Sequence, residues 1–496
     1  MNTADYLLES GQDHDIVLIT DKARCVYRDL REASARLAGE LSTSGVGPSD
    51  RVGIFGNNSL FWVAAYLATM KLGAVAVPFA TTLMPDEVSA MAHFAQCKVM
   101  CIEKRVHRRF AAALSEDLIF DDVLNQPGPS AWPSIPDTGG RQDAALMFTS
   151  GTTARPRAVR VTRRNIQANT DSIINYLGLT GADRMLTVLP FYYCFGTSLL
   201  HTHLRVGGSL TLCNTFAYPE TALDMMEHAE CTGFAGVPST YQTLLRNSSF
   251  PKRNIKTLRK VQQAGGKLPV VLIKELMAAL PDTEIYVMYG QTEATARLSY
   301  LPPSLLETKL GSIGKGIPGV ELRVIGESGN DVKPGEVGEI VAWGDNICPG
   351  YLNDPEESAH KFVDGALRTG DLATVDEDGF IYVVDRQSDF IKSYGYRVSS
   401  QQVEACVLEL QDIVAAAAIG EPDMVRGEAI KVFAVLRGGS KLTSDEIIAH
   451  CSQRLARHMV PKDVVFIDRL PMNAHGKIVK AELKKLAGQP TSEPIQ

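Results

Sequence analysis

The sequence predicts an α/β protein whose large N-terminal domain combines two doubly wound α/β subdomains with a small antiparallel β subdomain. A small α+β domain is predicted to follow. Two rounds of alternating apolar strands and helices precede residue 290, and Gly- and Asp-rich turns separate short strands after residue 311. A new helix and strand pattern begins after residue 386. The length of 496 residues is also too great for one core.

The first α/β unit is expected between residues 51 and 102. Short apolar runs predict strands at 51–55, 74–79 and 98–102. Apolar residues at helical spacing predict helices at 60–71 and 85–95. Strands that alternate with helices in this way form a parallel, doubly wound sheet. A loop rich in Pro, Gly and Asp then leads to a buried strand at 144–148.

The alternation restarts after that strand and then changes character twice. Further strands are expected at 185–190, 209–213, 233–237, 261–264 and 284–289, with helices at 164–177, 198–205, 220–228 and 270–279. Strands between turns at 321–325, 339–343 and 380–384 predict the antiparallel subdomain. The last unit has helices at 400–410 and 444–457 and strands at 413–420, 429–436 and 463–467. We therefore expect two domains, at 1–386 and 387–496.

Composition narrows the function classes. The chain has 45% hydrophobic and 22% charged residues, as ordinary globular proteins do. Its net charge of −7, without a basic block, argues against a nucleic-acid partner. Nine scattered cysteines favour reduced thiols in a cytoplasmic protein. The start of the chain lacks a signal-peptide pattern, and charged or helix-breaking residues interrupt its most apolar stretch, so we expect no membrane span.

The stretch after the strand at 144–148 has chemistry suited to phosphate. Four hydroxyl residues surround one glycine there: Thr149, Ser150, Gly151, Thr152 and Thr153. Their amides and hydroxyls can donate hydrogen bonds to phosphate oxygens, and the guanidinium of Arg157 suits the same ligand. No Gly-Lys-Ser/Thr closes the loop, so it is not a Walker A motif. On these residues alone, a solvated Ser/Thr-rich turn explains the stretch equally well.

Four further stretches place polar residues at turns. Tyr289, Gly290, Gln291, Thr292 and Glu293 end the strand at 284–289, and ligands bind at the carboxyl edge of α/β sheets. An aromatic ring can stack on a base there, and a carboxylate can hold Mg²⁺. The other stretches present Asp371 in a Gly turn, Gly395 between two tyrosines, and Lys477 in a small turn. Taken alone, the stretch from Tyr289 to Glu293 is better explained as a strand and turn with a surface glutamate, and Lys477 as a solvated lysine on a loop.

Together these motifs resemble the adenylate-forming superfamily. T-S-G-T-T-A-R-P-R, Y-G-Q-T-E, R-T-G-D, D-R-Q-S-D-F-I-K and N-A-H-G-K occur in this order and spacing, and the resemblance covers about 26–483. The superfamily contains acyl- and aryl-CoA synthetases, adenylation domains of nonribosomal peptide synthetases, and luciferases. It activates a carboxylic acid with MgATP to acyl-AMP and pyrophosphate, and a nucleophile, usually a thiol, then displaces AMP. Such a reaction mainly requires in-line placement and neutralisation of growing negative charge.

The resemblance assigns a role to each matching position. The nucleotide-binding set that it implies is Thr149, Ser150, Gly151, Thr152, Thr153, Arg157, Gly266, Lys267, Tyr289, Gly290, Gln291, Asp371 and Arg386. Within this set the Thr149 loop would hold the β- and γ-phosphates, Tyr289 would stack on adenine, and Asp371 and Arg386 would bind ribose. The implied catalytic residues are Lys477, Thr292 and Glu293, with Glu293 as the Mg²⁺ ligand. The C-terminal domain would rotate about Ser388 and exchange the Lys477 loop for the thiol-tunnel loop at Gly395.

Two regions depart from the family pattern. Ala154, Arg157 and Ala158 replace Gly, Lys and Gly of the phosphate loop, so we expect altered ATP affinity rather than inactivity. In the acyl-pocket region, Cys194 stands where amino-acid-activating domains place an Asp. Because a buried ammonium without a carboxylate is costly, an α-amino acid substrate is disfavoured. The candidate pocket residues are Tyr193, Phe195, Phe234 and Gly265, each equally compatible with a core position.

The main hypothesis is an ATP-dependent acid–thiol ligase that acts on a small carboxylic acid and most simply uses CoA. The first alternative transfers the acyl group to a carrier-protein phosphopantetheine or to an amine. An alternative of another class is a non-catalytic nucleotide-binding protein. The presence of Glu293, Asp371 and Lys477 argues against that last reading.

Overall fold

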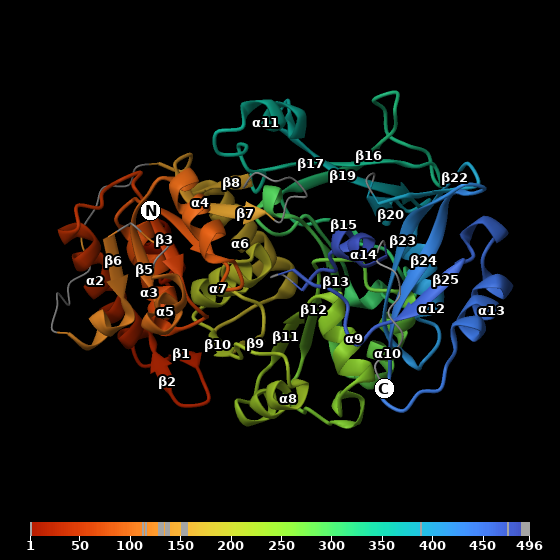
Figure 1. Ribbon diagram of the computed structural model, residues 1–496. Coiled ribbons are helices and arrows are strands. Elements are labelled where there is room, and N and C mark those ends of the chain that lie inside the picture. Colours follow the sequence, from red (N-terminus) through yellow and green to blue (C-terminus); the bar gives the residue numbers. More distant parts are fainter. Residues whose placement is uncertain are drawn as a thin grey trace.

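The computed structural model describes residues 2–111, 114, 117–126, 133, 139–149, 157–386, 389–473 and 476–487. Of the predicted site residues, Ser150, Gly151, Thr152, Thr153 and Ser388 lie outside the described residues, and only the backbone of Arg386 is described. The described chain forms four sheets, arranged in Figure 1 with the N-terminal units at the left and centre and the C-terminal unit at the right.

The first sheet confirms the predicted parallel unit. Its six strands lie in the order β6 (Asp117–Phe120), β5 (Cys97–Ile102), β3 (Arg51–Phe55), β4 (Val75–Phe79), β7 (Asp143–Thr149) and β8 (Arg157–Thr162). All neighbours are parallel except β7 and β8, which form an antiparallel pair. The helices of this part of the chain are α2 (Tyr27–Thr43), α3 (Leu60–Lys71), α4 (Pro85–Ala95) and α5 (Lys104–Phe110). Every side chain of α3 after Leu60 is buried, as its near-continuous apolar sequence requires.

The second sheet has nine strands and includes an edge that the sequence pattern did not predict. Its order is β15 (Lys315–Gly316), β14 (Ser299–Leu301), β13 (Glu284–Tyr289), β12 (Lys260–Gln263), β11 (Gly233–Gly236), β9 (Arg184–Thr187), β10 (Ser209–Leu212), β1 (Ile16–Ile19) and β2 (Arg24–Val26). The strands from β13 to β1 are parallel to one another. The chain start, with α1 (Thr3–Leu7), thus completes a sheet built mainly from residues after 184.

The helices associated with the second sheet are close to those predicted. They are α6 (Arg163–Leu177), α7 (Cys194–Val206), α8 (Pro219–His228), α9 (Pro238–Arg246) and α10 (Val270–Ala279). The predicted strand at 185–190 ends three residues early, at Thr187, and the helix expected from residue 198 begins four residues early, at Cys194. That earlier start places Cys194 and Phe195 in the first turn of α7.

The remaining two sheets match the predicted antiparallel subdomain and α+β unit. The third contains β16 (Val320–Ile325), β17 (Gly338–Gly344), β18 (Phe362–Val363), β19 (Ala366–Val375) and β20 (Ile381–Arg386), all antiparallel, with α11 (Pro355–Lys361) beside it. The fourth contains β21 (Ile391–Ser393), β22 (Tyr396–Val398), β23 (Ile413–Asp423), β24 (Gly427–Leu436) and β25 (Asp463–Phe466). Its helices are α12 (Ser400–Val407), α13 (Ser444–Arg454) and α14 (Lys480–Ala487).

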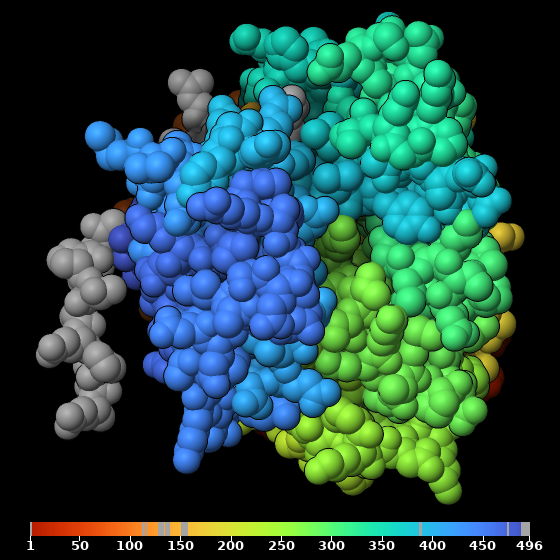
Figure 2. All heavy atoms as spheres, turned by 90° about the vertical axis from the view of Figure 1, so that its right-hand side faces the viewer, coloured from red at the N-terminus to blue at the C-terminus, as the bar shows by residue number. Residues whose placement is uncertain are grey.

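The C-terminal unit packs directly against the second sheet's helices, as Figure 2 shows for the blue and green segments. Arg246, at the end of α9, has a side chain only 1% exposed. It donates hydrogen bonds to the carbonyl oxygens of Leu408, Leu410 and Ile413 at the carboxyl end of α12 and beyond it. Glu275 of α10 pairs with the same guanidinium at 2.6 Å. Across the described residues, no helix is both long and apolar enough to cross a membrane.

Candidate active site

The candidate active site lies where the parallel strands of the second sheet end. β13 ends at Tyr289, and the chain turns sharply through a single 3₁₀ turn, η3 (Thr292–Ala294), into antiparallel β14. Gly290 is needed at this turn for space, because a Cβ there would lie 1.9 Å from the carbonyl oxygen of Ala296. This close approach sets Thr292 and Glu293 at the carboxyl edge of the sheet, where α/β proteins bind ligands.

Glu293 is buried and oriented by a tyrosine. Its Oε1 accepts a hydrogen bond of 2.8 Å from the hydroxyl of Tyr351. Burial raises the pKa of Tyr351, and the Glu293 charge raises it further, so the phenol remains a donor. One carboxylate oxygen is therefore held in place, an arrangement that suits a hard cation such as Mg²⁺.

Arg157 belongs to the same group of residues. Its guanidinium lies 5.1 Å from the centre of the Tyr351 ring and 3.3 Å from Oε1 of Glu357, with Oδ2 of Asp354 at 3.9 Å. The sequence suggested that this charge would face phosphate, but the structure gives it two acidic neighbours near α11. A phosphate at this arginine would have to compete with them.

Tyr289 and Asp371 come together although 82 residues separate them. The Tyr289 hydroxyl donates a hydrogen bond of 2.5 Å to Oδ2 of Asp371, on β19. In the pairing of β19 with β20, Asp371 lies directly opposite Arg386. The structure therefore assembles the residues that were expected to contact adenine and ribose at one place.

The A-G-G-K turn after β12 forms the next side of the site. Gln263 donates a hydrogen bond of 2.7 Å to the carbonyl oxygen of Gly266, and Lys267 donates one of 2.7 Å to the carbonyl oxygen of Val383 on β20. Burial lowers the pKa of Lys267, and Asp385 opposes that shift. Lys267 thus links the turn to β20 in this structure.

Three of the four predicted acyl-pocket residues lie together. Gly265 has φ +85°, and a Cβ there would lie 2.9 Å from the hydroxyl of Tyr193. Tyr193 in turn packs edge to face against Phe195, with ring centres 6.4 Å apart. Phe234 is a correction: it lies in a separate apolar core against Tyr241, because alternate residues of β11 face opposite sides of the sheet.

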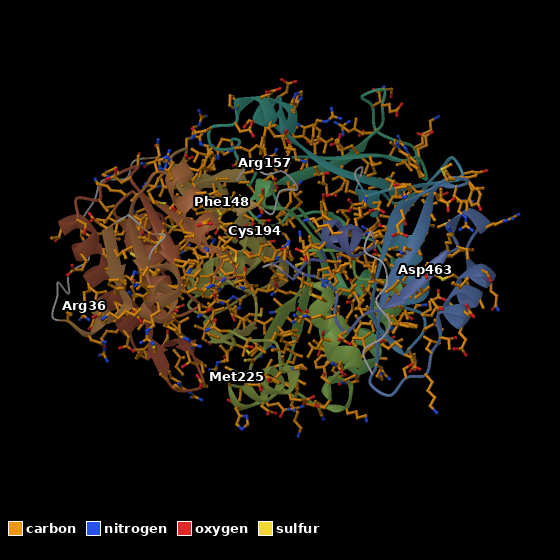
Figure 3. All side chains as sticks on the ribbon, viewed as in Figure 1. Arg36, Phe148, Arg157, Cys194, Met225 and Asp463 are labelled. Carbon is orange, nitrogen blue, oxygen red and sulfur yellow. The ribbon has the colours of Figure 1, made fainter. Side chains whose placement is uncertain are left out.

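Cys194 connects this pocket with the catalytic residues, and Figure 3 places it in the middle of the molecule. The Thr292 hydroxyl donates a hydrogen bond of 3.5 Å to the Cys194 sulfur. Burial raises the pKa of the Cys194 thiol, and the Glu293 charge acts in the same direction. Thr292, Lys477 and Arg297 oppose this rise in the pKa. Thr292 therefore contacts the sulfur directly, and the charges of Lys477, Arg297 and Glu293 lie close enough to influence the thiol.

A small cavity of about 20 Å³ adjoins Cys194. His201 and Tyr66 line it, and His201 Nε2 lies 2.9 Å from the Tyr66 hydroxyl. Burial lowers the pKa of His201 to about 3, so this histidine is neutral.

The Lys477 loop is docked on the N-terminal part of the chain. Ser239, at the start of α9, donates a hydrogen bond of 2.9 Å to the carbonyl oxygen of Gly476. Asn473 and Lys477 close the turn, with the Lys477 amide 3.0 Å from Asn473 Oδ1. Gly395, by contrast, lies at the exposed tip of the β21–β22 hairpin with φ +80°. The lysine loop, rather than the Gly395 loop, therefore faces the site.

Sequence reasoning missed Tyr351, which orients Glu293, and Arg297, which acts on Cys194. Tyr351 carried no local signal, because its partner lies 58 residues away. Arg297 carried one: it is a charged residue in the otherwise uncharged run Ala294–Leu301 that enters buried β14.

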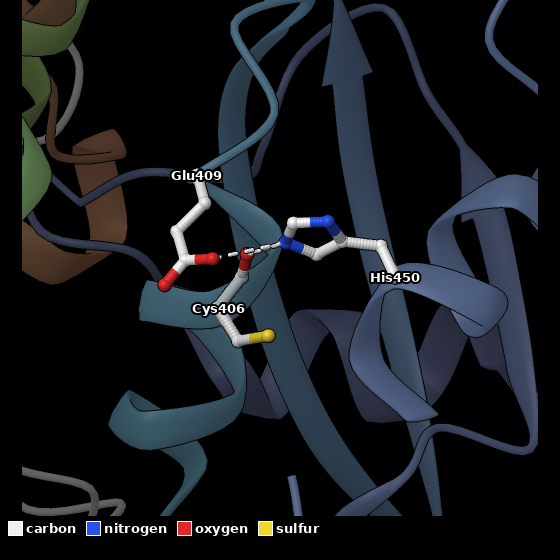
Figure 4. A group of neighbouring side chains, drawn as sticks. All are labelled: Cys406, Glu409 and His450. Atoms are coloured by element: carbon white, nitrogen blue, oxygen red, sulfur yellow. Dashed lines mark hydrogen bonds and ion pairs between the residues drawn. The ribbon is translucent and has the colours of Figure 1, made fainter. Parts of the chain in front are cut away.

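A second group of potential metal ligands lies in the C-terminal unit (Figure 4). His450 Nε2 is 3.1 Å from both the carbonyl oxygen of Cys406 and Oε2 of Glu409. Arg454 also binds that carboxylate oxygen, at 2.8 Å. We interpret the group as a cap on the carboxyl end of α12, because Nε2 of His450 already forms a hydrogen bond with the carbonyl oxygen of Cys406 in that helix.

Two family models match the chain. AMP-binding enzyme matches residues 9–352, and AMP-binding enzyme C-terminal domain matches residues 402–477. A feruloyl-CoA synthase from an Amycolatopsis species is 33% identical over 473 residues, which cover 93% of this chain and 94% of that protein. A 2-succinylbenzoate–CoA ligase from Bacillus velezensis is 31% identical over 476 residues, covering 95% of each chain.

Solved structures agree with these matches. An o-succinylbenzoate CoA synthetase from Bacillus subtilis, in complex with its acyl-adenylate intermediate, has a TM-score of 0.86 at 26% identity, covering 100% of this chain and 99% of that chain. An anthranilate CoA ligase shares the fold, with a TM-score of 0.92 at 24% identity over 98% of this chain and 97% of that chain. The resemblance read from the motifs is thus confirmed. This chain belongs to the AMP-binding enzyme family, among the adenylate-forming acyl- and aryl-CoA ligases.

Proposed function

We propose that this enzyme joins a small carboxylic acid to CoA through an acyl-adenylate, with Mg²⁺ and ATP in the first step. The observation that carries the proposal is the contact of Thr292 with Cys194 at the carboxyl edge of the second sheet, next to buried Glu293, together with the docking of the Lys477 loop on Ser239. The relatives described above are named as CoA ligases or synthases, so neither a carrier-protein acceptor, an amine acceptor nor a non-catalytic role is favoured.

The first half-reaction needs its negative charge neutralised at two points. Lys477 would bridge the acid's carboxylate and the α-phosphate, which Thr292 would also contact. Glu293, held by Tyr351, would bind Mg²⁺. A solved o-succinylbenzoate CoA synthetase with ATP and a magnesium ion, 27% identical to this chain, supports Mg²⁺ as the metal. Tyr289, Asp371 and Arg386 would hold the nucleoside, and Tyr193, Phe195 and Gly265 would border the acid.

The second half-reaction would require a rotation of the C-terminal domain, 387–496, about Ser388. The docked Lys477 loop and the exposed Gly395 hairpin support this proposal, because each is where the adenylate-forming arrangement would require it. The rotation would bring Gly395 to the site as the passage for the CoA thiol. The absence of disulfides among nine free cysteines is compatible with the cytoplasmic location expected from the sequence.

The test is ATP–pyrophosphate exchange across a panel of carboxylic acids, followed by addition of CoA, holo-carrier protein or an amine. We expect exchange with at least one acid and product formation with CoA. Lys477→Ala should reduce exchange by about 100-fold or more, while transfer from preformed acyl-AMP to CoA stays largely intact. Lys485→Ala, an exposed position on α14, is the matched control. Equal loss of both half-reactions in Lys477→Ala would contradict the role given to this lysine.

A further inference from the structure

Arg297 is a buried cation without an acidic partner in the described structure. The residue is 1% exposed, yet its Nε and Nη2 make no hydrogen bond within the described residues. Its backbone is held firmly, because the Arg297 carbonyl oxygen accepts hydrogen bonds from Asn169 at 3.0 Å and Asn346 at 2.8 Å. The position of the side chain is therefore built into the fold, although its charge is not balanced there.

The groups that face the guanidinium cannot neutralise it. Its central carbon lies 4.5 Å from the centre of the Phe195 ring, which offers only a cation–π contact. Tyr176 also interacts with it. Burial raises the pKa of Tyr176, and Arg297 opposes the rise, so the phenol is neutral. A guanidinium keeps its charge in proteins, and an unpaired buried charge is costly. A bound anion would remove that cost.

The position of Arg297 favours one kind of anion. Arg297 and Lys477 both act electrostatically on Cys194, whose sulfur accepts a hydrogen bond from Thr292. Under the proposed function, Lys477 and Thr292 serve the carboxylate that reacts. Arg297 lies instead against Phe195, one of the residues expected to border the acid. The guanidinium, with two buried donors that have no partner among the described residues, thus contacts a residue expected to border the acid.

Ala296, the residue before Arg297, and Cys194 line the neighbouring cavity, whose volume is about 20 Å³. His201 at its wall is neutral, since burial lowers the pKa of that imidazole to about 3. Two cations among the described residues act on Cys194, Lys477 and Arg297. Lys477 is assigned to the reacting carboxylate, so Arg297 is the one available for a second anion.

We propose that Arg297 binds a second carboxylate of the substrate and makes this enzyme selective for short dicarboxylic acids. The inference rests on the proposed function and adds to it the substrate class. Guanidinium and carboxylate pair through two parallel hydrogen bonds, and Nε and Nη2 of Arg297 are two donors that have no partner among the described residues. A monocarboxylic acid of the same shape would leave the buried guanidinium unpaired, and the enzyme would discriminate against it.

The test compares matched acids in wild type and variants. Succinate, glutarate and phthalate are each assayed against their monomethyl esters by ATP–pyrophosphate exchange and by CoA-thioester formation. We expect wild type to favour its best diacid over the ester by about 100-fold in kcat/KM. Arg297→Met should bring that ratio close to one, and Arg297→Lys should keep part of it. Arg323→Met, at an exposed ion pair with Asp331, should leave the ratio unchanged.

A binding measurement provides a readout that does not depend on turnover. The preferred diacid should raise the melting temperature of wild type in the presence of AMP, and its monomethyl ester should raise it much less. Arg297→Met should lose this difference, and Arg297→Gln serves if the methionine variant does not fold. Equal use of diacids and esters by wild type, or a diacid preference that survives in Arg297→Met, would overturn this inference alone. If wild type shows no exchange with any acid, the proposed function fails, and the inference fails with it.

Discussion

Arg246 holds the C-terminal unit in the arrangement seen here, and replacing it should impair one half-reaction selectively. Its buried guanidinium donates to the carbonyl oxygens of Leu408, Leu410 and Ile413, with distances of 2.7 Å to Leu408 and 3.3 Å to Leu410. The carbonyls at the end of α12 have no partner within the helix, and the helix dipole favours a cation there. Arg246→Met would keep the apolar stem of the side chain and remove every donor.

The size of the effect follows from these contacts. A hydrogen bond from a charged donor contributes about 1.5–3 kcal/mol. In the undocked form that the proposed rotation would produce, water would take over the carbonyl oxygens and Glu275 would keep its pairing with Arg246, so only part of the sum would be lost on undocking. We take about 3 kcal/mol for the three bonds together, which corresponds to about 150-fold in the ratio of docked to undocked molecules. The adenylation rate should fall by less than this ratio, by about 10- to 100-fold, because most molecules can stay docked over part of the shift.

Single-turnover assays can separate the two half-reactions. Adenylation is followed by pyrophosphate release, and transfer is followed from preformed acyl-AMP to CoA. We expect Arg246→Met to slow adenylation and to leave transfer unchanged or faster, with Arg246→Lys in between. Arg253→Met is the matched control, because the ion pairs described for Arg253 are with Glu220, Asp224 and Glu227 of α8, which belong to the N-terminal part of the chain. Equal losses in both half-reactions, or no loss in either, would refute the reasoning.

Two further predictions concern the active site and its cavity. Tyr351→Phe removes the donor that orients Glu293, so we expect Mg²⁺ to bind about tenfold more weakly, which would raise the KM for Mg²⁺ in pyrophosphate exchange about tenfold. An unchanged KM for Mg²⁺ would contradict this. Burial lowers the pKa of His201 from 6.5 to about 3, so the unfolded chain binds a proton that the folded chain does not, and stability falls as the pH drops below 6.5. This histidine should lower the free energy of unfolding by about 2 kcal/mol between about pH 7 and pH 5. Over the same pH range, urea unfolding of His201→Gln should show a decrease that is smaller by about 2 kcal/mol. Parallel pH profiles of the two proteins would exclude this explanation.

The fold was predictable where a local pattern decided it. Strands such as β3 and β13 are short apolar runs between turns, and their positions agree with the sequence to the residue. The pairing of β1 with β10 was not predictable, because Leu18 and Leu210 are brought together only by the finished sheet. Phe234 shows the same limit within one strand: its apolar character was plain, but the side of the sheet that it faces depends on the register of β11.

The candidate site divides in the same way. The motifs at Tyr289, Thr292, Glu293 and Lys477 are readable in sequence because phosphate chemistry requires particular residue types at turns, and these turns are local. Arg297 belongs to no such motif. The relatives are named for different acids, feruloyl and 2-succinylbenzoate among them, so a residue that contacts the acid need not follow a pattern shared by the family. Its importance arises only when Phe195, Tyr176 and Cys194 surround it and none of them carries the opposite charge. The residues shared by the family therefore indicate that an acid is activated, whereas the class of acid proposed above rests on a charge that only the tertiary structure leaves unbalanced.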